Sequence, residues 1–231
     1  GVATTIEGKE FIDKATKLLK EFEEFSKSFT NTSNKNATIN ISIPSTIYFT
    51  LLLSKFIQNN SISEIKKINI TEGSSEEIID NVIKEVSSIG IICVNDSELA
   101  YYKHLLLLNN LEILTVNSFK LQIVINANNP LSKLNFINEK NLENQVIVIN
   151  NKIDYSKYSN FNKINTNAKF IKVPGGFNQL LMVSKLENSF MFSPPLPVEL
   201  LEKNNCVNLE FESNSNNKWH IILLKNKNKN N

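Results

Sequence analysis

The sequence predicts an α/β fold with parallel sheets, preceded by a long N-terminal helix. Strand-like and helix-like segments alternate from residue 37 to residue 94, and this order is typical of a parallel sheet. A second series begins at about residue 118 and follows the same strand-then-helix order. Residues 6–29 carry apolar side chains at helical spacing, which predicts the preceding helix.

The helix expected at 6–29 carries an apolar seam with a period of about 3.5 residues. The seam consists of Phe11, Ala15, Leu18, Phe22, Phe25 and Phe29. Such a seam keeps facing one partner helix, whereas a helix packed on its own domain usually shows a broader stripe. The pattern therefore favours dimerisation through this helix. A helix folded on its own domain stays the alternative, because the seam covers only about three heptads.

The elements that follow are expected in this order. Alternating isoleucines predict the first strand, helical spacing of apolar residues predicts the helix at 76–87, and the almost wholly apolar run at 89–94 is typical of a strand buried on both faces. Strands are expected at 37–43, 64–71, 89–94, 111–116, 120–126, 145–149, 169–173, 190–192, 206–211 and 219–224, and helices at 47–57, 76–87, 139–142, 177–186 and 199–203. Residues 101–108 fit a helix or a strand.

Composition excludes several classes of protein. The 231 residues allow one large domain or two small ones. A net charge of +2 demands neither nucleic acid nor an anionic membrane as partner, and no apolar run approaches the roughly 20 residues that cross a bilayer. All 25 basic residues are lysine. A bound anion must therefore be held by helix N-termini, hydroxyls or lysine rather than by a guanidinium.

Cysteine and histidine are too sparse for a metal site or an obvious catalytic site. Cys93 and Cys206 form neither a disulfide framework nor a CxxC motif, and no Cys/His spacing suits zinc. His104 lies in a leucine run and His220 follows Trp219, so no nucleophile–base pair is visible. We expect no catalytic residue, metal or cofactor. The lack of a signal peptide predicts the cytoplasm, and an initial glycine suggests that sequence upstream is missing.

The strongest site signal lies where parallel strands end. Ligands bind beyond the carboxyl ends of such strands, where helix N-termini also point. The residues expected at these ends are Ser45, Thr46, Ser74, Ser75 and Cys93. Each serine could instead be a helix cap, and Cys93 could be an inert buried thiol.

The order of motifs resembles the LysR-type transcriptional regulators of bacteria over essentially the whole chain. The segment 5–8 (Thr-Ile-Glu-Gly) is similar to the T-x-x-G that joins the family's winged helix-turn-helix to its linker helix. The segments 39–46 and 72–75 resemble the first two ligand-facing turns of its effector-binding domain, and 129–131 (Asn-Pro-Leu) stands where the family often has His-Pro-Leu. The segment 136–142 resembles the one that comes next. The sequence departs from the family at Leu186-Glu187-Asn188, where Gly-x-Gly is usual.

The resemblance implies two Rossmann-like subdomains of the type 2 periplasmic-binding-protein fold after a linker helix. The expected boundaries are 1–32 for the linker and dimerisation helix, 37–115 plus 206–225 for subdomain I, 116–205 for subdomain II, and 226–231 for a disordered tail. Linker helices dimerise in this family, in agreement with the apolar seam. DNA would be contacted only through an N-terminal domain that this chain lacks.

The function implied is that of a sensor domain, which binds a small anionic metabolite between the two subdomains in a homodimer or homotetramer. Gly176, Phe177 and Asn178, at the start of the third helix, would face the five strand-end residues of subdomain I. A solute-binding receptor of the same fold, serving a transporter, is the alternative. The lack of a lipoprotein cysteine at the start and the phenylalanine seam count against it. An enzyme is the third reading.

Overall fold

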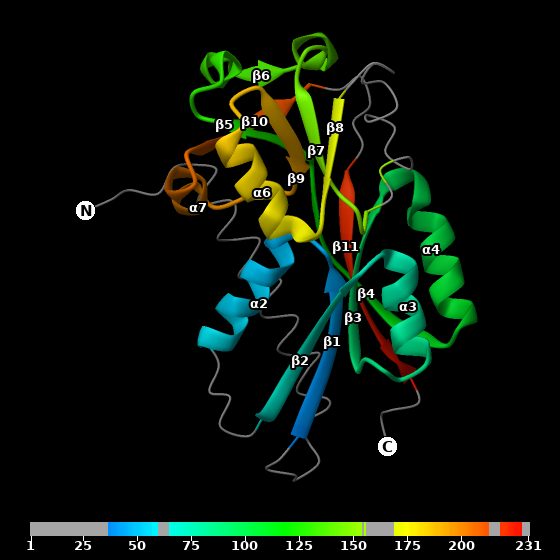
Figure 1. Cartoon of the computed structure of the whole chain (residues 1–231). Coiled ribbons are helices and arrows are strands. Elements are labelled where there is room, and N and C mark those ends of the chain that lie inside the picture. Colours follow the sequence, from blue (N-terminus) through cyan, green and yellow to red (C-terminus); the bar gives the residue numbers. More distant parts are fainter. Residues whose placement is uncertain (1–36, 60–64, 154, 156–168, 213–217, 228–231) are drawn as a thin grey trace. The chain divides into compact units, whose positions relative to one another are not determined.

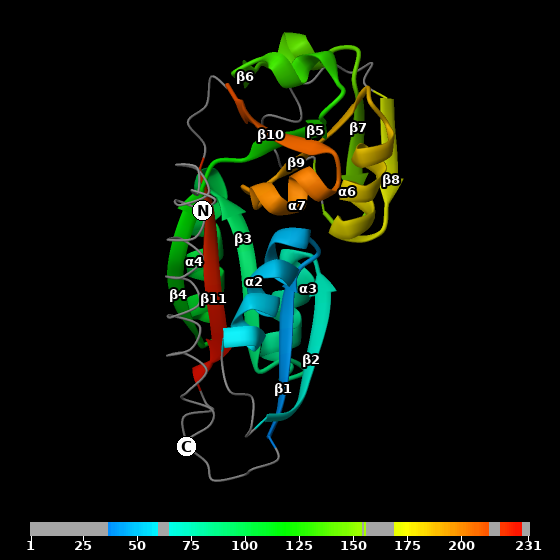
Figure 2. The ribbon, with the colours of Figure 1, turned by 90° about the vertical axis from the view of Figure 1, so that its left-hand side faces the viewer.

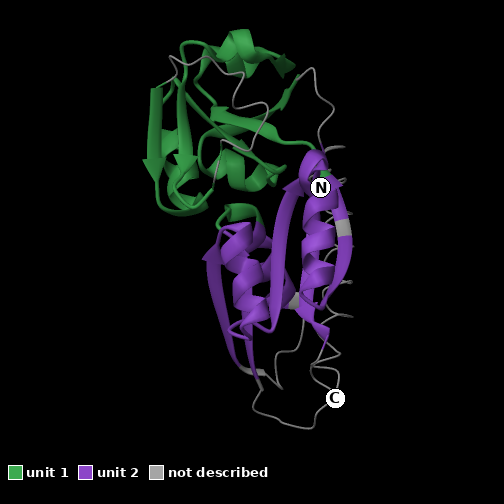
Figure 3. Cartoon of the chain, turned by 90° about the vertical axis from the view of Figure 1, so that its right-hand side faces the viewer, with its two compact units in different colours: residues 1–11, 45–48, 119–217 green, residues 12–44, 49–118, 218–231 purple. Residues whose placement is uncertain are grey.

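The computed structural model describes residues 37–59, 65–153, 155, 169–212 and 218–227. The chain divides into two compact units (Figure 3). Unit 1 comprises residues 1–11, 45–48 and 119–217, and unit 2 comprises residues 12–44, 49–118 and 218–231. The expected helix at 6–29 and its seam lie outside the described residues.

Unit 2 contains a five-stranded sheet in the order β2-β1-β3-β11-β4. Its strands are β1 (Ala37–Pro44), β2 (Ile65–Gly73), β3 (Ile89–Asn95), β4 (Leu111–Phe119) and β11 (Trp219–Asn226). β1 pairs in parallel with both β2 and β3, whereas β11 runs antiparallel to β3. The parallel strands β1, β2 and β3 are the ones that the alternation of strands and helices over residues 37–94 predicts. The antiparallel strand β11 comes from the C-terminal part of the chain.

The described residues of unit 2 also contain the helices α3 (Ser75–Ile83) and α4 (Asp96–Leu108) and, from residue 49 on, α2 (Ile47–Asn59). α3 and α4 lie on the same face of the sheet (Figure 1). There they bury a core that includes Ile78, Ile79, Val82, Tyr102, Leu106, Ile92, Val94, Ile222 and Leu224. The ambiguous residues 101–108 are therefore helical. Their helix starts earlier than the apolar spacing suggests, because Asn95 caps it by accepting from the Glu98 backbone N–H.

Unit 1 contains a six-stranded sheet in the order β6-β10-β5-β9-β7-β8 (Figure 2). Its strands are β5 (Gln122–Asn126), β6 (Phe136–Ile137), β7 (Val146–Asn150), β8 (Lys169–Val173), β9 (Ser189–Ser193) and β10 (Cys206–Phe211). β7 pairs in parallel with β8 and β9, while β5 runs antiparallel to β9 and β10. The expected boundaries placed 206–211 in subdomain I. The hydrogen-bonded pairing of β10 with β5 and β6 places this strand in unit 1 instead.

The described residues of unit 1 also form two helices and two 3₁₀ turns. They are α6 (Gly175–Lys185), α7 (Val198–Lys203), η2 (Pro130–Lys133) and η3 (Glu139–Leu142). The core on the sheet includes Ile123, Ile125, Ile137, Leu142, Ile147, Phe190 and Phe192. The prediction of an α/β fold with parallel strands is confirmed, and each sheet adds antiparallel strands to the parallel set.

Candidate functional site

The first part of the candidate site is a close backbone contact within unit 1. Residues 45–48, which follow β1 and include the first two residues of α2, belong to this unit. A Cβ atom built on Gly176 would lie 2.4 Å from the Ile47 backbone nitrogen and 2.8 Å from Thr46 Cα. Gly175 just before it has φ 73°, a conformation that favours glycine. The two glycines therefore let the start of α6 reach the backbone of Thr46 and Ile47.

Asn150, the last residue of β7, joins this contact through its carboxamide. The side chain is fully buried, and its Nδ2 donates to both the carbonyl oxygen and the Oγ of Ser45, the second contact measuring 3.2 Å. Its Oδ1 accepts from the Lys152 backbone N–H at 2.9 Å. Both ends of the carboxamide are thus hydrogen-bonded inside unit 1.

The cluster extends from Asn150 to two further buried polar side chains. The Tyr155 hydroxyl accepts from the Asn150 backbone N–H at 3.3 Å and from Gln179 Nε2 at 3.1 Å. Gln179 also donates to the Val148 carbonyl at 2.8 Å. Burial raises the pKa of Tyr155 above its usual value, and the two donors oppose that rise. Polar groups are rarely buried without hydrogen bonds. We call Ser45, Asn150, Tyr155 and Gln179 the Asn150 cluster.

The other two residues expected at the start of α6 are exposed. The side chain of Phe177 is 61% exposed. The side chain of Asn178 turns back, where its Nδ2 donates to the Pro174 carbonyl at 2.6 Å. Among the expected residues, the structure brings Ser45, Thr46 and Gly176 together within unit 1. Phe177 and Asn178 follow on the same helix.

Ser74, Ser75 and Cys93 lie in unit 2. Ser74 caps α3 in a reciprocal arrangement, since its Oγ accepts from the Glu77 backbone N–H and the Glu77 carboxylate accepts from the Ser74 backbone N–H. The capping alternative therefore holds for Ser74. Capping leaves its hydroxyl proton available to donate, so the residue also stays a candidate ligand.

Both described cysteines are neutral thiols. Cys93 lies within β3 opposite Ile221 of β11, two residues before the strand ends, and burial raises the pKa of its thiol far above the usual value. Burial raises the pKa of Cys206 to about 11. Because the thiolate is the reactive form, neither residue is poised for nucleophilic or redox chemistry.

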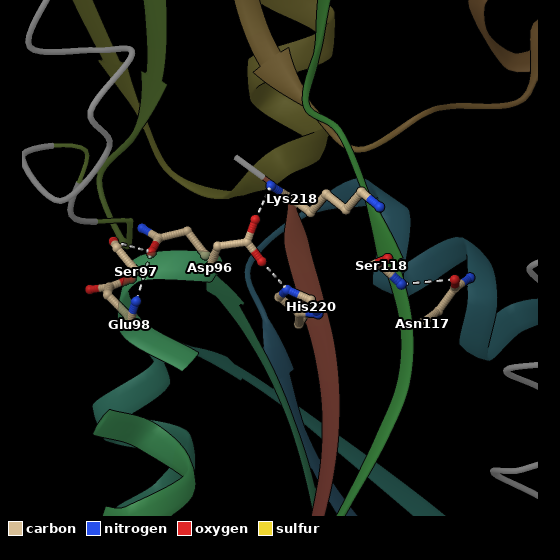
Figure 4. A network of polar contacts seen from close by, with 8 residues as sticks. Asp96, Ser97, Glu98, Asn117, Ser118, Lys218 and His220 are labelled. Carbon is tan, nitrogen blue, oxygen red and sulfur yellow. Dashed lines mark hydrogen bonds and ion pairs between the residues drawn. The ribbon is translucent and has the colours of Figure 1, made fainter. Parts of the chain in front are cut away.

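A second polar cluster lies at the junction of β3, α4 and β11 in unit 2 (Figure 4). Asp96 Oδ1 accepts from His220 Nε2 at 2.5 Å, and Oδ2 accepts from the Lys218 backbone N–H at 2.8 Å. The Asp96 backbone N–H donates to the Lys218 carbonyl at 3.0 Å. The hydrogen bond from His220, followed by that from Lys218, holds the pKa of Asp96 below its usual value. This cluster fastens the start of β11 to the start of α4.

Sequence reasoning missed Asn150, Tyr155 and Gln179. Asn150 could have been found, because it directly follows the strand expected at 145–149, and strand ends were the signal that pointed to Ser45. Tyr155 lies in an asparagine-rich stretch expected to be a loop, and Gln179 lies inside a helix. No pattern in the sequence singles out either one.

Among the residues that the structure describes, no group of three or more His, Cys, Asp or Glu side chains could hold a metal ion. Within the same residues, no helix is long and apolar enough to cross a membrane. The side chains of the Asn150 cluster offer hydrogen bonding through hydroxyl and amide groups.

The fold of this chain is similar to that of solved regulatory domains of LysR-type proteins. No family model and no curated protein sequence matches the chain. The effector-binding domain of QuiR in complex with shikimate is similar in structure, with a TM-score of 0.58 at 18% identity over 84% of this chain and 88% of that one. The reduced OxyR regulatory domain from Pseudomonas aeruginosa reaches 0.61 at 10% identity, over 84% and 91%. The regulatory domain of MetR, a LysR family regulator from N. meningitidis, reaches 0.57 at 11% identity, over 83% and 86%.

Proposed function

We propose that this chain is the effector-binding domain of a LysR-type bacterial transcriptional regulator and that it senses a small anionic metabolite in the cytoplasm. The observation that carries the proposal is the Asn150 cluster: a buried set of hydroxyl and amide groups at the carboxyl end of a parallel strand, beside a helix N-terminus. The effector-binding domain of QuiR, which is similar in fold, was solved in complex with shikimate, a carboxylate. Ligands of open α/β sheets bind at such strand ends.

The anion would be held without arginine. Backbone N–H groups at the start of α6 carry the positive end of the helix dipole, and Ser45 and Thr46 add hydroxyl groups next to them. Ser74 and Ser75, at the start of α3 in unit 2, are the further ligands that we propose. Cys93 is the weakest member of the set, because its buried thiol has little polarity to offer.

Signal transmission would follow from a difference in affinity between two arrangements of the units. An effector shifts such an equilibrium only by the amount that it prefers one state, commonly about 1–3 kcal/mol. The linker helix expected at 6–29 would pass this shift to a partner subunit and to an N-terminal DNA-binding domain.

A screen of small carboxylates, with shikimate among them, tests the proposal. We expect at least one to raise the melting temperature, because a ligand that binds only the folded state stabilises it. Calorimetry on that compound should then show weaker binding to Thr46→Val. The matched control is Thr71→Val, the same change on the exposed outer part of β2. Equal affinities for Thr46→Val and wild type would contradict the proposed site.

Two alternative functions, a solute-binding receptor and an enzyme, have less support than a regulatory domain. A solute-binding receptor would share the architecture, but the neighbours named above are regulatory domains. An enzyme would need reactive groups within reach of one another, and the described thiols are neutral and buried. Genomic sequence upstream of Gly1 that encodes an in-frame winged helix-turn-helix would separate a regulator from a receptor.

A further inference from the structure

We propose that the sheet of unit 1 presents unused hydrogen-bond acceptors to a donor group of the effector, so that the site prefers a carboxylate that also carries a hydroxyl or an ammonium group. This preference adds a second recognition element to the anion site of the proposed function, on which it rests. Three residues on neighbouring strands carry it: Gln122 on β5, Ser193 on β9 and Asn208 on β10. We call them the Gln122 group.

The Gln122 group lies on the same face of the sheet as the side chain of Asn150. Val146 pairs in parallel with Ser189, so Asn150 and Ser193, which follow them at the same spacing and end β7 and β9, share one face. Ser193 in turn pairs with Gln122 on the next strand. The polar side chains therefore follow one another across the carboxyl ends of two parallel strands, where ligands of such sheets bind.

Two acceptor atoms of the Gln122 group are buried without a donor. Neither Gln122 Oε1 nor Asn208 Oδ1 has a hydrogen-bond partner, although both atoms are buried. The orientation of Asn208 is fixed, because its Nδ2 donates to the Leu196 carbonyl at 3.0 Å and a carbonyl can only accept. Buried polar atoms are rarely left unpaired. This part of the sheet therefore lacks a donor.

Ser193 places a third unused polar group beside these two. Its side chain is only 4% exposed, and its hydroxyl has no hydrogen-bond partner among the residues that the structure describes. It stands directly opposite Gln122, and Asn208, which pairs with Val124, is the diagonal neighbour of Gln122. Side chains in these positions have Cβ atoms about 5 Å and about 7 Å apart. One small polar group can therefore reach more than one member of the Gln122 group.

A hydroxyl or an ammonium group on the effector supplies the missing donor. Either group can donate to Gln122 Oε1, and the Ser193 hydroxyl can accept from both or donate to a hydroxyl. Gln122 as a whole is only partly buried, so its long side chain can turn toward an arriving group. Glu210, which pairs with Gln122 on β10, is exposed and adds a negative charge that favours the ammonium. An effector with only hydrogen on that carbon would leave the acceptors unpaired.

Calorimetry on two series of acids measures this preference. Succinate, malate and aspartate differ by a hydrogen, a hydroxyl or an ammonium group on one carbon, and so do propionate, lactate and alanine. We expect a donor-bearing acid to bind wild type at least about tenfold more tightly than its parent acid, because a site built to hydrogen-bond a group rejects the analogue that lacks it. The tighter of the two donor-bearing acids identifies the donor. If none of the six binds, a hit from the screen and its analogue without the donor group take their place.

Gln122→Met and Ser193→Ala should reduce this preference to less than about threefold. Ser189→Ala is the matched control for the serine, since Ser189 lies on the same face of β9 and donates to the Leu186 carbonyl at 2.7 Å. Gln145→Met is the control for the glutamine, because Gln145 Oε1 accepts from Asn129 Nδ2 at 2.8 Å. Both controls should keep the wild-type preference.

Urea denaturation without any effector gives a second, independent readout. Gln122→Met should leave the urea midpoint unchanged or raise it, because it removes a buried acceptor that has no donor. Gln145→Met and Ser189→Ala should lower the midpoint, because each breaks a hydrogen bond. A Gln122→Met midpoint that falls as far as that of Gln145→Met would overturn the inference, since the carboxamide would then already have a partner.

The binding data can fail in two distinguishable ways. Equal affinities of wild type for parent and donor-bearing acids, or a preference that survives in both Gln122→Met and Ser193→Ala, would overturn the inference and leave the anion site standing. Should either variant not fold, the wild-type comparison and the other variant decide. A wild-type protein that binds no carboxylate at all would contradict the proposed function itself, and this inference with it.

Discussion

Gly176 marks the point where the absence of a side chain brings two elements of unit 1 into contact. The start of α6 meets the backbone of Thr46 and Ile47 at a separation that leaves no room for Cβ. Ser45 and Asn150 form their hydrogen bonds at the same place. A residue without a side chain and a buried polar pair therefore share the candidate site.

Replacing Gly176 by alanine should destabilise the protein and distort the site. The added methyl would stand 2.4 Å from the Ile47 nitrogen, and backbone cannot yield as a flexible side chain does. We expect a loss of about 1–3 kcal/mol in the free energy of unfolding, measured by urea denaturation. Ala100→Gly, an exposed helical position, should cost less, about 1 kcal/mol. A Gly176→Ala protein as stable as wild type would show that the close approach does not persist in solution.

The two cysteines should be unreactive in the folded protein. Burial raises the pKa of Cys93 far above neutrality and that of Cys206 to about 11, so almost no thiolate exists at pH 7. We expect alkylation by a maleimide at pH 7 to be slow in native protein and fast in urea, as followed by mass spectrometry. Rapid native labelling of either thiol would contradict this and would revive thiol-based sensing as a function.

At the scale of elements, α3 and α4 each begin directly after a strand and each carries a side-chain cap. Ser74 caps α3 and Asn95 caps α4. The cap of α3 explains why the start of this helix was predictable: residues 73–77 (Gly-Ser-Ser-Glu-Glu) are typical of a helix N-terminus. The start of α4 was not located from the sequence, because β3 ends at Asn95, α4 begins at Asp96 with no turn between them, and the apolar spacing emerges only later.

The pairing of Asp96 with β11 should make stability depend on pH on the acid side. The pKa of Asp96 is lowered in the folded state by His220 and Lys218. A lowered pKa means that the carboxylate contributes stability above its ordinary pKa of 3.8, and that this contribution disappears as the pH falls through the folded value. We expect Asp96→Asn to lower the urea midpoint at pH 7 and to lose that effect at acid pH, as the pH falls through the lowered pKa of Asp96.

Asp80→Asn is the control for this prediction. Asp80 pairs with Lys84 at 2.7 Å across one turn of α3, and both side chains are more than half exposed. Exposed pairs of this kind contribute little to stability, so the midpoint should hardly move at either pH. If the urea midpoint of Asp96→Asn equals that of Asp80→Asn at both pH values, the hydrogen bonds between Asp96 and β11 contribute nothing measurable to stability.

The antiparallel strands show where sequence reasoning stops. Helical and strand periodicity located nearly every described element to within a few residues. Pairing partners were not predictable, because a strand such as β10 carries an alternation that suits any sheet edge. Its placement beside β5 depends on contacts between residues far apart in the sequence. The same holds for the site: Ser45 and Asn150 each follow an expected strand, but the hydrogen bond that joins them across 105 positions was not predictable.

At the scale of the whole molecule, the remaining prediction concerns association. The seam at 11–29 lies outside the described residues, so the dimer stays a prediction from the sequence. We expect sedimentation equilibrium to give a dimer or a larger assembly and Phe22→Glu to weaken it, because a charge in an apolar seam must be desolvated. Lys20→Glu, off the seam, should leave association unchanged. A wild-type monomer at high concentration would refute the seam as an interface.

Hydrogen exchange with and without a bound carboxylate tests whether one effector binds at helix starts of both units. We expect amide exchange to slow on binding at 45–48 and 175–178 in unit 1 and at 74–77 in unit 2. Slowing confined to a single unit, or to segments away from these helix starts, would contradict it.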